Sequence, residues 1–224
     1  MNASVMFAQQ IIGDGNVVQE NRSVSSFDKI QVDDIINVFL KQGNTESVIL
    51  ESDKNLIPLI EIKVDDNKLY ISTKDDAEIK KSTKMNAYVT LKDLKSLEMK
   101  GVGNVESQNE LKLESLWIEN SAVGNLSLEL DCDKLTADIN SVGSAKFSGT
   151  VKNVSIDHNG IGNIKAFDLT ADVLKIQSNG VGNSEVNSNN EIYIDLNGIG
   201  NVSYKGSAVV KAMNVNGMGK VKKM

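Results

Sequence analysis

Few side chains in this sequence could perform acid–base, nucleophilic or metal-dependent chemistry. The chain contains one histidine, His158, and one cysteine, Cys132. A single histidine cannot build a multi-histidine metal centre, and a single cysteine excludes an intramolecular disulfide and a thiolate-rich zinc site. We therefore predict no catalytic residues, no metal site and no cofactor.

Carboxylates are the remaining candidates for catalysis, and several of them stand in close pairs. These pairs are Asp33/Asp34, Asp65/Asp66, Asp75/Asp76 and Asp131/Asp133. A glycosidase needs two carboxyl groups about 5 to 10 Å apart across a groove. None of the pairs recurs at a position that would align it with another, so we interpret them as solvated turn residues. A weak calcium site at one pair is the alternative.

Aromatic residues make up only 4% of the chain, so an outward-facing one is a candidate for ligand contact. Trp117 is out of phase with the apolar residues on both sides of it, and Tyr193 has the same setting, so both should point to solvent. An exposed aromatic ring on a flat strand face can contact sugars or proteins. The outward row that we expect is Glu98, Trp117, Asp138, Ser155, Lys175, Tyr193 and Asn214. We predict Trp117 and Tyr193 as ligand contacts on one face.

The elements that position these side chains follow from an internal repeat. The signature Asn-Gly-[Val/Ile/Met]-Gly-Asn-apolar returns, with variations, from residue 100 onward at a spacing of about 19 residues. Its second glycines are Gly103, Gly124, Gly143, Gly162, Gly182, Gly200 and Gly219. A fixed period of this kind is typical of architectures built from stacked units.

Each repeat contains two short strands joined by the glycine corner. Apolar residues alternate before the key glycine, as in Leu116 and Ile118, and again after it, as in Leu126 and Leu128. Period-two alternation predicts strands with one buried face. The residue just before the key glycine is always apolar, and we expect it to point inward. These residues are Val102, Val123, Val142, Ile161, Val181, Ile199 and Met218.

The period also predicts how the repeats stack. About 19 extended residues make a rung of about 60 Å without any helix, and rungs about 4.8 Å apart bury each other's apolar faces. The predicted fold is all-β: a right-handed parallel β-solenoid, or single-stranded β-helix, with an irregular N-terminal β cap. Corner asparagines, including Asn163, Asn183 and Asn201, should form hydrogen-bonded amide ladders. An exposed asparagine row that grips sugar or ice is the alternative.

The positions of His158 and Cys132 within the repeat predict a structural role for each of them. His158 lies four residues before a key glycine, in a mostly inward column that also contains Asn120 and Ser178. We expect it to be buried and hydrogen-bonded beside one of them rather than to act as a base. Cys132 falls in the Asp131–Asp133 segment, which we interpret as a turn, and is expected to be an unreactive thiol.

The rest of the chain divides around the repeats. Residues 94–224 form the solenoid, and residues 13–93 form a β region that continues its sheets and caps one end. Residues 1–12 are expected to be a signal-peptide remnant or a disordered tail. In the cap we expect strands at 27–32, 36–40, 48–51, 68–72 and 87–91, a helical turn at 53–60, an exposed loop at 74–84 and a corner copy at 13–17. At the other end, Lys220, Lys222 and Lys223 should protect the last strand edge.

Composition and charge exclude several classes of partner. Apolar residues make up 40% and charged residues 24% of the chain, which is ordinary for a folded globular protein. The formal net charge is -6, with a pI near 4.9, which argues against nucleic-acid binding. No run of 18 apolar residues is present, so we predict no transmembrane segment.

Several segments, in this order, carry a family resemblance. They are residues 15–18 (GNVV), 26–32 (SFDKIQV), 69–73 (LYIST) and 94–97 (LKSL), followed by the repeated Gly-[Val/Ile]-Gly-Asn corners. Together they resemble the head GIN domain family of auto-transporter adhesins, found mainly in Bacteroidetes, from about Gly13 to the end. The resemblance implies a secreted or surface-attached β-solenoid, and it supplies no established catalytic residues.

The functional prediction is a non-catalytic, adhesin-like binding module that is secreted, periplasmic or on the outer cell surface. Its partner would be a glycan or a host or bacterial surface protein. One alternative is a polysaccharide-active enzyme built on a β-helix, which would release reducing ends or unsaturated sugars. The other is a purely structural surface or assembly subunit, which would self-associate without binding glycans.

Overall fold

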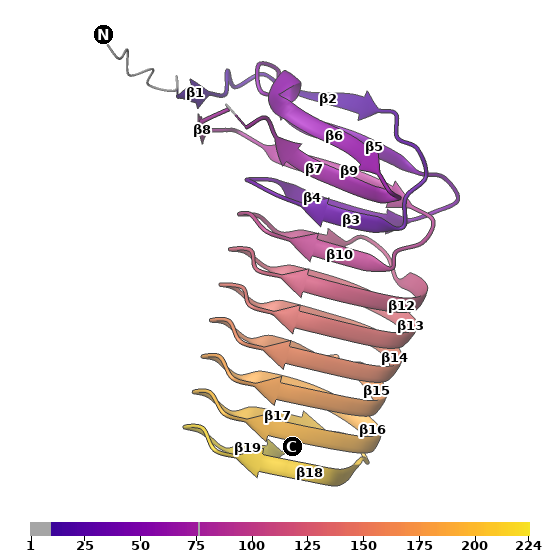
Figure 1. The fold of residues 1–224 in the computed structure, drawn as a ribbon, viewed down its shortest axis with the longest axis vertical. Helices are drawn as coiled ribbons and strands as arrows, with labels where there is room; N and C mark the ends of the chain where they lie inside the picture. The colour runs from indigo at the N-terminus through magenta and orange to yellow at the C-terminus, as the bar shows by residue number, and fades with distance from the viewer. Residues whose placement is uncertain (1–9, 76) are drawn as a thin grey trace.

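The computed structural model describes residues 10–75 and 77–224, which form a β-solenoid with a distinct N-terminal end (Figure 1). The rungs follow one another from the cap to the C-terminus, and strands of successive rungs lie side by side. The all-β solenoid predicted from the repeat is confirmed. Residues 1–9, most of the segment interpreted as a signal-peptide remnant or tail, lie outside the described part, as does Asp76 of the Asp75/Asp76 pair.

Parallel pairing in register joins the rungs. The row Leu116, Leu135, Val154 and Leu174 runs straight across four strands, as the repeat alignment requires. The solenoid strands are β10 (Ser96–Met99), β11 (Val105–Ser107), β12 (Leu111–Asn120), β13 (Leu126–Ile139), β14 (Ala145–His158), β15 (Ile164–Ser178), β16 (Ser184–Leu196), β17 (Val202–Lys205), β18 (Val209–Val215) and β19 (Val221–Lys223). The long strands β13 to β16 continue without interruption through the bend opposite the glycine corner.

Alternate residues of these strands fill the interior. Leu126, Leu128 and Leu130 on β13 are buried, and Phe147 on β14 is among the largest fully buried side chains. Burial of one such side chain stabilises the fold by about 1.5 to 3 kcal/mol. The core therefore runs the length of the solenoid as stacked layers of Val, Ile, Leu and Ala.

The apolar residue before each key glycine points outward, so the inward orientation expected from the sequence is wrong. Between 46 and 69% of each of these side chains is exposed: Val102, Val123, Val142, Ile161, Val181, Ile199 and Met218. Their backbones form parallel bridges with one another along the corner. The residue one position earlier, such as the buried Ala122 or Ser141, faces inward instead. Period-two alternation thus continues into the corner, where only a small side chain fits inside.

The cap continues the two sheets before it changes direction. Strands β3 (Lys29–Val32) and β4 (Asn37–Gln42) pair in parallel with β10 and β11, and β7 (Lys68–Thr73) and β9 (Met85–Leu91) stack on them. The outer strands β2 (Val17–Arg22), β5 (Ser47–Asp53) and β6 (Ile60–Asp65) are antiparallel to their neighbours. A 3-10 helix, η1 (Ile57–Leu59), provides the helical turn expected around Pro58. Antiparallel strands end the parallel stack here.

Two expectations for the cap are wrong in detail. Residues 13–17 do not form a solenoid corner, because the buried Asp53 carboxylate organises them as a loop by accepting hydrogen bonds from the Gly15 and Thr83 backbone N–H groups at 2.8 and 2.7 Å. The segment 74–84 is not entirely loop, since β8 (Ile79–Lys81) pairs in parallel with β1 (Ile11–Ile12). Within residues 10–75 and 77–224, no helix is long and apolar enough to cross a membrane.

Candidate ligand-binding face

Outward residues near the end of each long strand form one continuous row along the solenoid. The register places Trp117 beside Thr136, Ser155 beside Lys175, and Lys175 beside Tyr193. The full row is Ser96, Trp117, Thr136, Ser155, Lys175, Tyr193 and Ala212. Trp117 and Tyr193 stand four rungs apart, about 19 Å at the usual strand spacing. We call this row the Trp117–Tyr193 face.

Glu98, Asp138 and Asn214 do not belong to this row, contrary to the expectation from sequence. They lie two residues further along their strands, in a second outward row. That row is Glu98, Glu119, Asp138, Asp157, Gln177, Asp195 and Asn214. Outward positions recur at every second residue, so alternation alone cannot separate the two rows, whereas the strand register does.

The second row is acidic, and its members differ in environment. Burial, reinforced by the neighbouring Asp138 charge, raises the pKa of Asp157. At Glu98, burial also acts to raise the pKa. Hydrogen bonds from Lys68 and Lys100, at 2.6 and 3.0 Å, outweigh this effect, so the pKa of Glu98 is lowered. No three His, Cys, Asp or Glu side chains among the described residues gather into a group that could hold a metal ion. The row therefore presents carboxylates as hydrogen-bond acceptors.

Two shallow depressions lie along the Trp117–Tyr193 face. The first, of about 450 Å³, is lined by Lys134, Leu135, Thr136, Asn153, Val154, Ser155, Val173, Lys175 and Tyr193. The second, of about 300 Å³, shares Ser155, Lys175 and Tyr193 with the first and extends to Asp157, Gln177 and Asp195 of the acidic row. The small side chains of Thr136 and Ser155 leave space between the larger residues. Hydroxyl, amide, ammonium and carboxylate groups thus surround one tyrosine ring.

Polar contacts fix the orientation of Tyr193. Its hydroxyl donates a hydrogen bond to Glu191 Oε2 at 3.0 Å, and this bond, together with burial, raises the pKa of Tyr193. Lys175 Nζ lies 5.3 Å from the ring centroid, and Glu191 also pairs with Lys211 at 3.2 Å. The hydrogen bond to Glu191 therefore fixes the hydroxyl end of the tyrosine ring, and the Lys175 ammonium group covers part of one ring face.

Trp117 occupies the cap-side half of the same row. Its side chain is 37% exposed, as expected from its phase relative to Leu116 and Ile118. Its neighbour in the next rung toward the C-terminus is Thr136, and Glu119 follows two residues later on the same side of the strand. An apolar indole surface next to hydroxyl and carboxylate groups suits a ligand with both an apolar face and hydroxyl groups.

The asparagine after the key glycine forms a hydrogen-bonded ladder. Asn125 Nδ2 donates to Asn104 Oδ1 at 3.2 Å, and Asn201 Nδ2 donates to Asn183 Oδ1 at 3.2 Å. The Asn183 backbone N–H donates to Asn163 Oδ1 at 2.9 Å. Such amide bonds between rungs contribute about 0.5 to 1.5 kcal/mol each. They account for asparagine at this position without a ligand.

A second asparagine ladder runs three positions before the key glycine. Asn179 Nδ2 donates to Asn159 Oδ1 at 2.8 Å, Asn197 to Asn179 at 3.0 Å, and Asn216 to Asn197 at 3.1 Å. The exposed apolar ridge of the corner lies between the two ladders in sequence. The ladders therefore bind neighbouring rungs together on both sides of each glycine bend.

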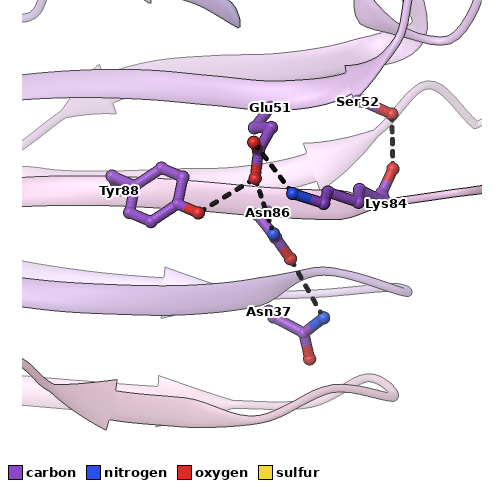
Figure 2. Close-up of polar contacts among 6 residues, drawn as sticks. All are labelled: Asn37, Glu51, Ser52, Lys84, Asn86 and Tyr88. Carbon is purple, nitrogen blue, oxygen red and sulfur yellow. Dashed lines mark hydrogen bonds and ion pairs between the residues drawn. The ribbon is translucent and has the colours of Figure 1, made fainter. Parts of the chain in front are cut away.

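The first ladder extends into the cap and ends on a carboxylate (Figure 2). Asn37 Nδ2 donates to Asn86 Oδ1 at 3.2 Å, and Asn86 Nδ2 donates to Glu51 Oε2 at 3.0 Å. Tyr88 and Lys84 donate to the same carboxylate at 2.9 and 3.1 Å. The Asn86 bond, with those from Lys84 and Tyr88, lowers the pKa of Glu51 although burial opposes it. This network joins the antiparallel cap to the parallel rungs, and nothing in the sequence pattern pointed to it.

His158 is buried next to Ser178, as its column predicts, but Asn120 lies two rungs away. The expected hydrogen bond is not formed at Nδ1, which is buried and has no hydrogen-bond partner within the described ranges. Burial lowers the pKa of His158. The folded protein therefore holds a neutral imidazole that is buried away from the Trp117–Tyr193 face.

The lowered pKa of His158 predicts a loss of stability in mild acid. Below the reference pKa of 6.5 the unfolded chain takes up a proton that the folded chain excludes, so the free energy of unfolding falls as pH decreases. The slope attributable to this group is at most about 1.4 kcal/mol per pH unit. Urea unfolding from pH 7 to pH 5 measures it.

The matched control is His158→Ile, because Ile139 occupies the same column one rung earlier. We expect this variant to lose the dependence between pH 6.5 and the folded-state pKa, while carboxylate effects at lower pH persist. Parallel stability profiles for the two proteins from pH 7 to pH 5 would contradict the assignment.

The other candidate residues stay apart from the face. Asp131, Cys132 and Asp133 lie within strand β13 rather than in a turn, and the Cys132 side chain is buried. Burial raises the pKa of the Cys132 thiol to about 11, so the thiolate form is scarce at neutral pH. Asp34, by contrast, is a turn residue with a φ of 62° that accepts a hydrogen bond from the Thr73 N–H at 2.8 Å.

Sequence reasoning missed the acidic row and the two depressions. The acidic row could have been found by counting outward positions from the inward residues of each strand instead of scanning for adjacent aspartates. The depressions have no such signal, because they depend on which small side chains become neighbours across β13, β14 and β15.

Comparison with protein families identifies the class to which this solenoid belongs. Residues 26–208 match the family model described as "Putative auto-transporter adhesin, head GIN domain". Since the match spans most of the chain, the protein belongs to the head GIN domain family. A comparison with curated proteins gave no match.

Several solved structures share the fold of this chain. A crystal structure called a putative adhesin from Bacteroides fragilis is 29% identical, covers 96% of this chain and 100% of its own, and has a TM-score of 0.92. A putative adhesin from Parabacteroides merdae is 22% identical, covers 96 and 99%, and has a TM-score of 0.71. A Parabacteroides distasonis structure called a putative lipid binding protein is 21% identical, covers 96 and 100%, and has a TM-score of 0.67. The last two show the fold alone.

Proposed function

We propose that this protein is a non-catalytic, adhesin-like binding module, secreted or at the cell surface, that binds an elongated glycan along the Trp117–Tyr193 face. One observation carries the proposal: two aromatic residues stand in a single outward row, with hydroxyl-lined depressions beside Tyr193 and an acidic row alongside. The family description supports an adhesin role.

The dimensions of the face favour a polymer over a small molecule. The two aromatic rings are too far apart to stack on one sugar ring, at about 19 Å along the row. The depressions beside Tyr193 are open and shallow, so recognition would rely on several rungs at once. A chain of sugar units fits this geometry because each unit can meet the same repeated set of hydroxyl and carboxylate groups.

The placement of the carboxylates favours binding over hydrolysis. Asp138, Asp157 and Asp195 lie in one row on the same side of the Trp117–Tyr193 face. Glycoside hydrolysis needs two carboxyl groups on opposite sides of the scissile bond. Glu191 lies on the other side of Tyr193 from this row, but hydrogen bonds from Tyr193 and Lys211 lower the pKa of Glu191. Glu191 therefore has no proton to donate as a general acid, and a ligand lying along the face would meet acceptors for its hydroxyl groups.

The test is a glycan array followed by titration calorimetry with the glycan that binds. We expect the double variant Trp117→Ala/Tyr193→Ala to weaken binding about 5- to 150-fold, because two aromatic contacts of about 0.5 to 1.5 kcal/mol each sum to about 1 to 3 kcal/mol. Phe167→Ala is the matched control, since Phe167 is a partly exposed aromatic on another part of β15 and should leave affinity unchanged.

Each alternative function predicts a different result. Unchanged affinity in the double variant would remove this face as the contact surface. Release of reducing ends or unsaturated sugars, abolished by Asp157→Asn, would replace the binding role with an enzymatic one. Absence of any glycan binding together with concentration-dependent self-association would indicate a structural subunit.

A further inference from the structure

The glycine corners stack along one edge of the solenoid, and a row of apolar side chains follows this edge (Figure 1). Parallel backbone bridges join the members of the row, which therefore repeat once per rung, about 4.8 Å apart. Each side chain is between 46 and 69% exposed: Val102, Val123, Val142, Ile161, Val181, Ile199 and Met218. We call this row the corner ridge. A contiguous exposed apolar row of this kind marks an interaction site more often than a lone apolar residue does.

The corner ridge lies within a strip that carries no charge. In the five rungs from Val123 to Ile199, the outward residues on both sides of the ridge are serine or asparagine. They are Ser121, Asn140, Asn159, Asn179 and Asn197 before the ridge, and Asn125, Ser144, Asn163, Asn183 and Asn201 after it. The whole chain is 24% charged, with a formal net charge of -6. Another surface can therefore cover this strip without burying a charge.

The asparagine ladders beside the ridge keep hydrogen-bonding capacity for a second surface. Among the described residues, Asn201 Nδ2 donates one side-chain hydrogen bond, to Asn183 Oδ1 at 3.2 Å. Asn197 Nδ2 likewise donates one, to Asn179 Oδ1 at 3.0 Å. An amide group carries two N–H donors, so each of these side chains has one that its ladder does not use. The strip thus combines an apolar centre with a polar, uncharged rim.

Charged rows run along both sides of this uncharged strip. The acidic row lies on one side, and Asp138 and Asp157 are its members in two successive rungs. In the same two rungs, Lys146 and Lys165 lie on the other side. The full row on that side is Glu106, Ser127, Lys146, Lys165, Glu185, Ser203 and Lys222. In the middle of the solenoid the strip is therefore acidic on one side and basic on the other.

We propose that the corner ridge binds the corner ridge of a second copy of this chain, in a parallel, side-by-side dimer whose two-fold axis runs along the solenoid. The half-turn places Asp138 and Asp157 of one copy on the same side of the interface as Lys146 and Lys165 of the second copy. An antiparallel pair would instead place the two acidic rows beside each other. Each ridge residue meets its own equivalent, so the rung spacing matches along the whole contact.

The size of the contact predicts a weak, reversible dimer. The corner ridge is about 29 Å long and the strip about 13 Å wide at the usual strand spacings. A standard stable interface covers about 800 Å² on each partner, roughly twice this footprint. We therefore expect a dissociation constant of about 10 to 100 μM.

Dimerisation would change what the Trp117–Tyr193 face can do. This face lies on one sheet beside the corner, so the half-turn directs the two faces of the dimer to opposite sides. A dimer would then link two glycan chains rather than hold one chain more tightly. This consequence rests on the proposed function, whereas the dimer itself does not.

The corner ridge has two competing explanations. Within one chain, β-branched side chains contact one another along the row and stabilise the rungs, which predicts a monomer at every concentration. A lipid surface is another partner that could cover aliphatic side chains flanked by uncharged groups. That explanation predicts that the protein floats with phosphatidylcholine vesicles. Both explanations are separable from a dimer by direct measurement.

Sedimentation velocity with the full chain, from about 10 μM to about 1 mM, tests for the dimer. Ile161→Asp should weaken association at least tenfold, because the two-fold axis brings the two new carboxylates together. The matched control is Ile12→Asp, the same change at a cap residue that is 56% exposed, and it should leave association unchanged. Ile161 is 59% exposed, so both variants should fold, which thermal melts would verify.

Cross-linking with a short bismaleimide tests the orientation of the two copies. In a parallel dimer, Val123→Cys should cross-link to itself, and so should Ile199→Cys. Ile12→Cys measures the background from random collisions. The wild-type protein should stay uncross-linked, because its Cys132 is buried.

Four results would overturn the proposal. The first is a wild-type protein that stays monomeric up to about 1 mM, tenfold or more above the expected dissociation constant. The second is an equal loss of association in the two aspartate variants. The third is cross-linking of Val123→Cys only when it is mixed with Ile199→Cys, which would show an antiparallel pair. The fourth is flotation with phosphatidylcholine vesicles, abolished by Ile161→Asp, in a protein that forms no dimer. None of these results bears on glycan binding, so the proposed function is tested separately.

Discussion

Replacing Gly162 by alanine is expected to lower the free energy of unfolding by about 3 kcal/mol, measured by urea denaturation. Gly162 has a φ of 153°, and a Cβ built there would lie 1.7 Å from the backbone oxygen of Gly143 in the preceding rung. The cost combines an unfavourable backbone conformation, about 1 to 2 kcal/mol, with overpacking, about 1 to 3 kcal/mol. Backbone cannot move aside as a flexible side chain would, so the rungs must separate.

Gly15→Ala is the matched control, because it isolates the backbone contribution. Gly15 also has a positive φ, 80°, but a Cβ at this position would meet no atom within 4 Å. We expect it to cost about 1 kcal/mol, the conformational part alone. Equal losses in the two variants would show that close approach between rungs is not what requires glycine at the corner.

The corner glycines illustrate what the sequence could predict about the fold. Their period specified the parallel register, because a glycine that touches the glycine of the preceding rung must recur at the same place in each turn. The outward orientation of Val142 and its equivalents was misjudged, because an apolar side chain was taken as evidence of burial. On a stacked corner, β-branched residues also contact one another along the row, so half-exposed positions accept them.

The cap was harder to read because its strands pair out of chain order. β3 and β4 pair with β10 and β11, although strands β5 to β9 lie between them in the sequence. Local alternation located most of these strands, but pairing partners far apart in sequence leave no local signal. The Glu51 network arises from this pairing, since its donors come from β9 and from Lys84 just before it.

The candidate face shows the same division between local and non-local information. The phase of Trp117 within its own strand predicted an outward side chain, and that orientation is confirmed. The neighbours of Trp117 in the adjacent rungs were not predictable from its phase. A shift of the strand register by two residues leaves the same side chains pointing outward but changes every neighbour. Asp138 was therefore assigned to the wrong row, and the acidic row went unnoticed.

Truncating Phe147 to alanine should destabilise the protein by about 3 to 5 kcal/mol, the range for large aromatic residues removed from a core. Phe147 is fully buried in the middle of the solenoid. Each rung contacts only its neighbours, so the cavity weakens the interfaces on both sides of β14. Urea unfolding gives the loss of free energy, and hydrogen exchange should show the largest loss of protection in β13, β14 and β15.

Met213→Ala tests whether position along the solenoid determines the cost. Met213 faces the same interior, but it lies in the last rung and is 40% exposed, so its truncation leaves little cavity and should cost about 1 kcal/mol or less. The affected amides should be those of β18, with the central rungs unchanged. A loss as large as that of Phe147→Ala, or one spread over the whole chain, would mean that the solenoid unfolds as one cooperative unit. In that case stability would not depend on the position of a residue along the solenoid, and nearest-neighbour coupling between rungs would be the wrong description of this fold.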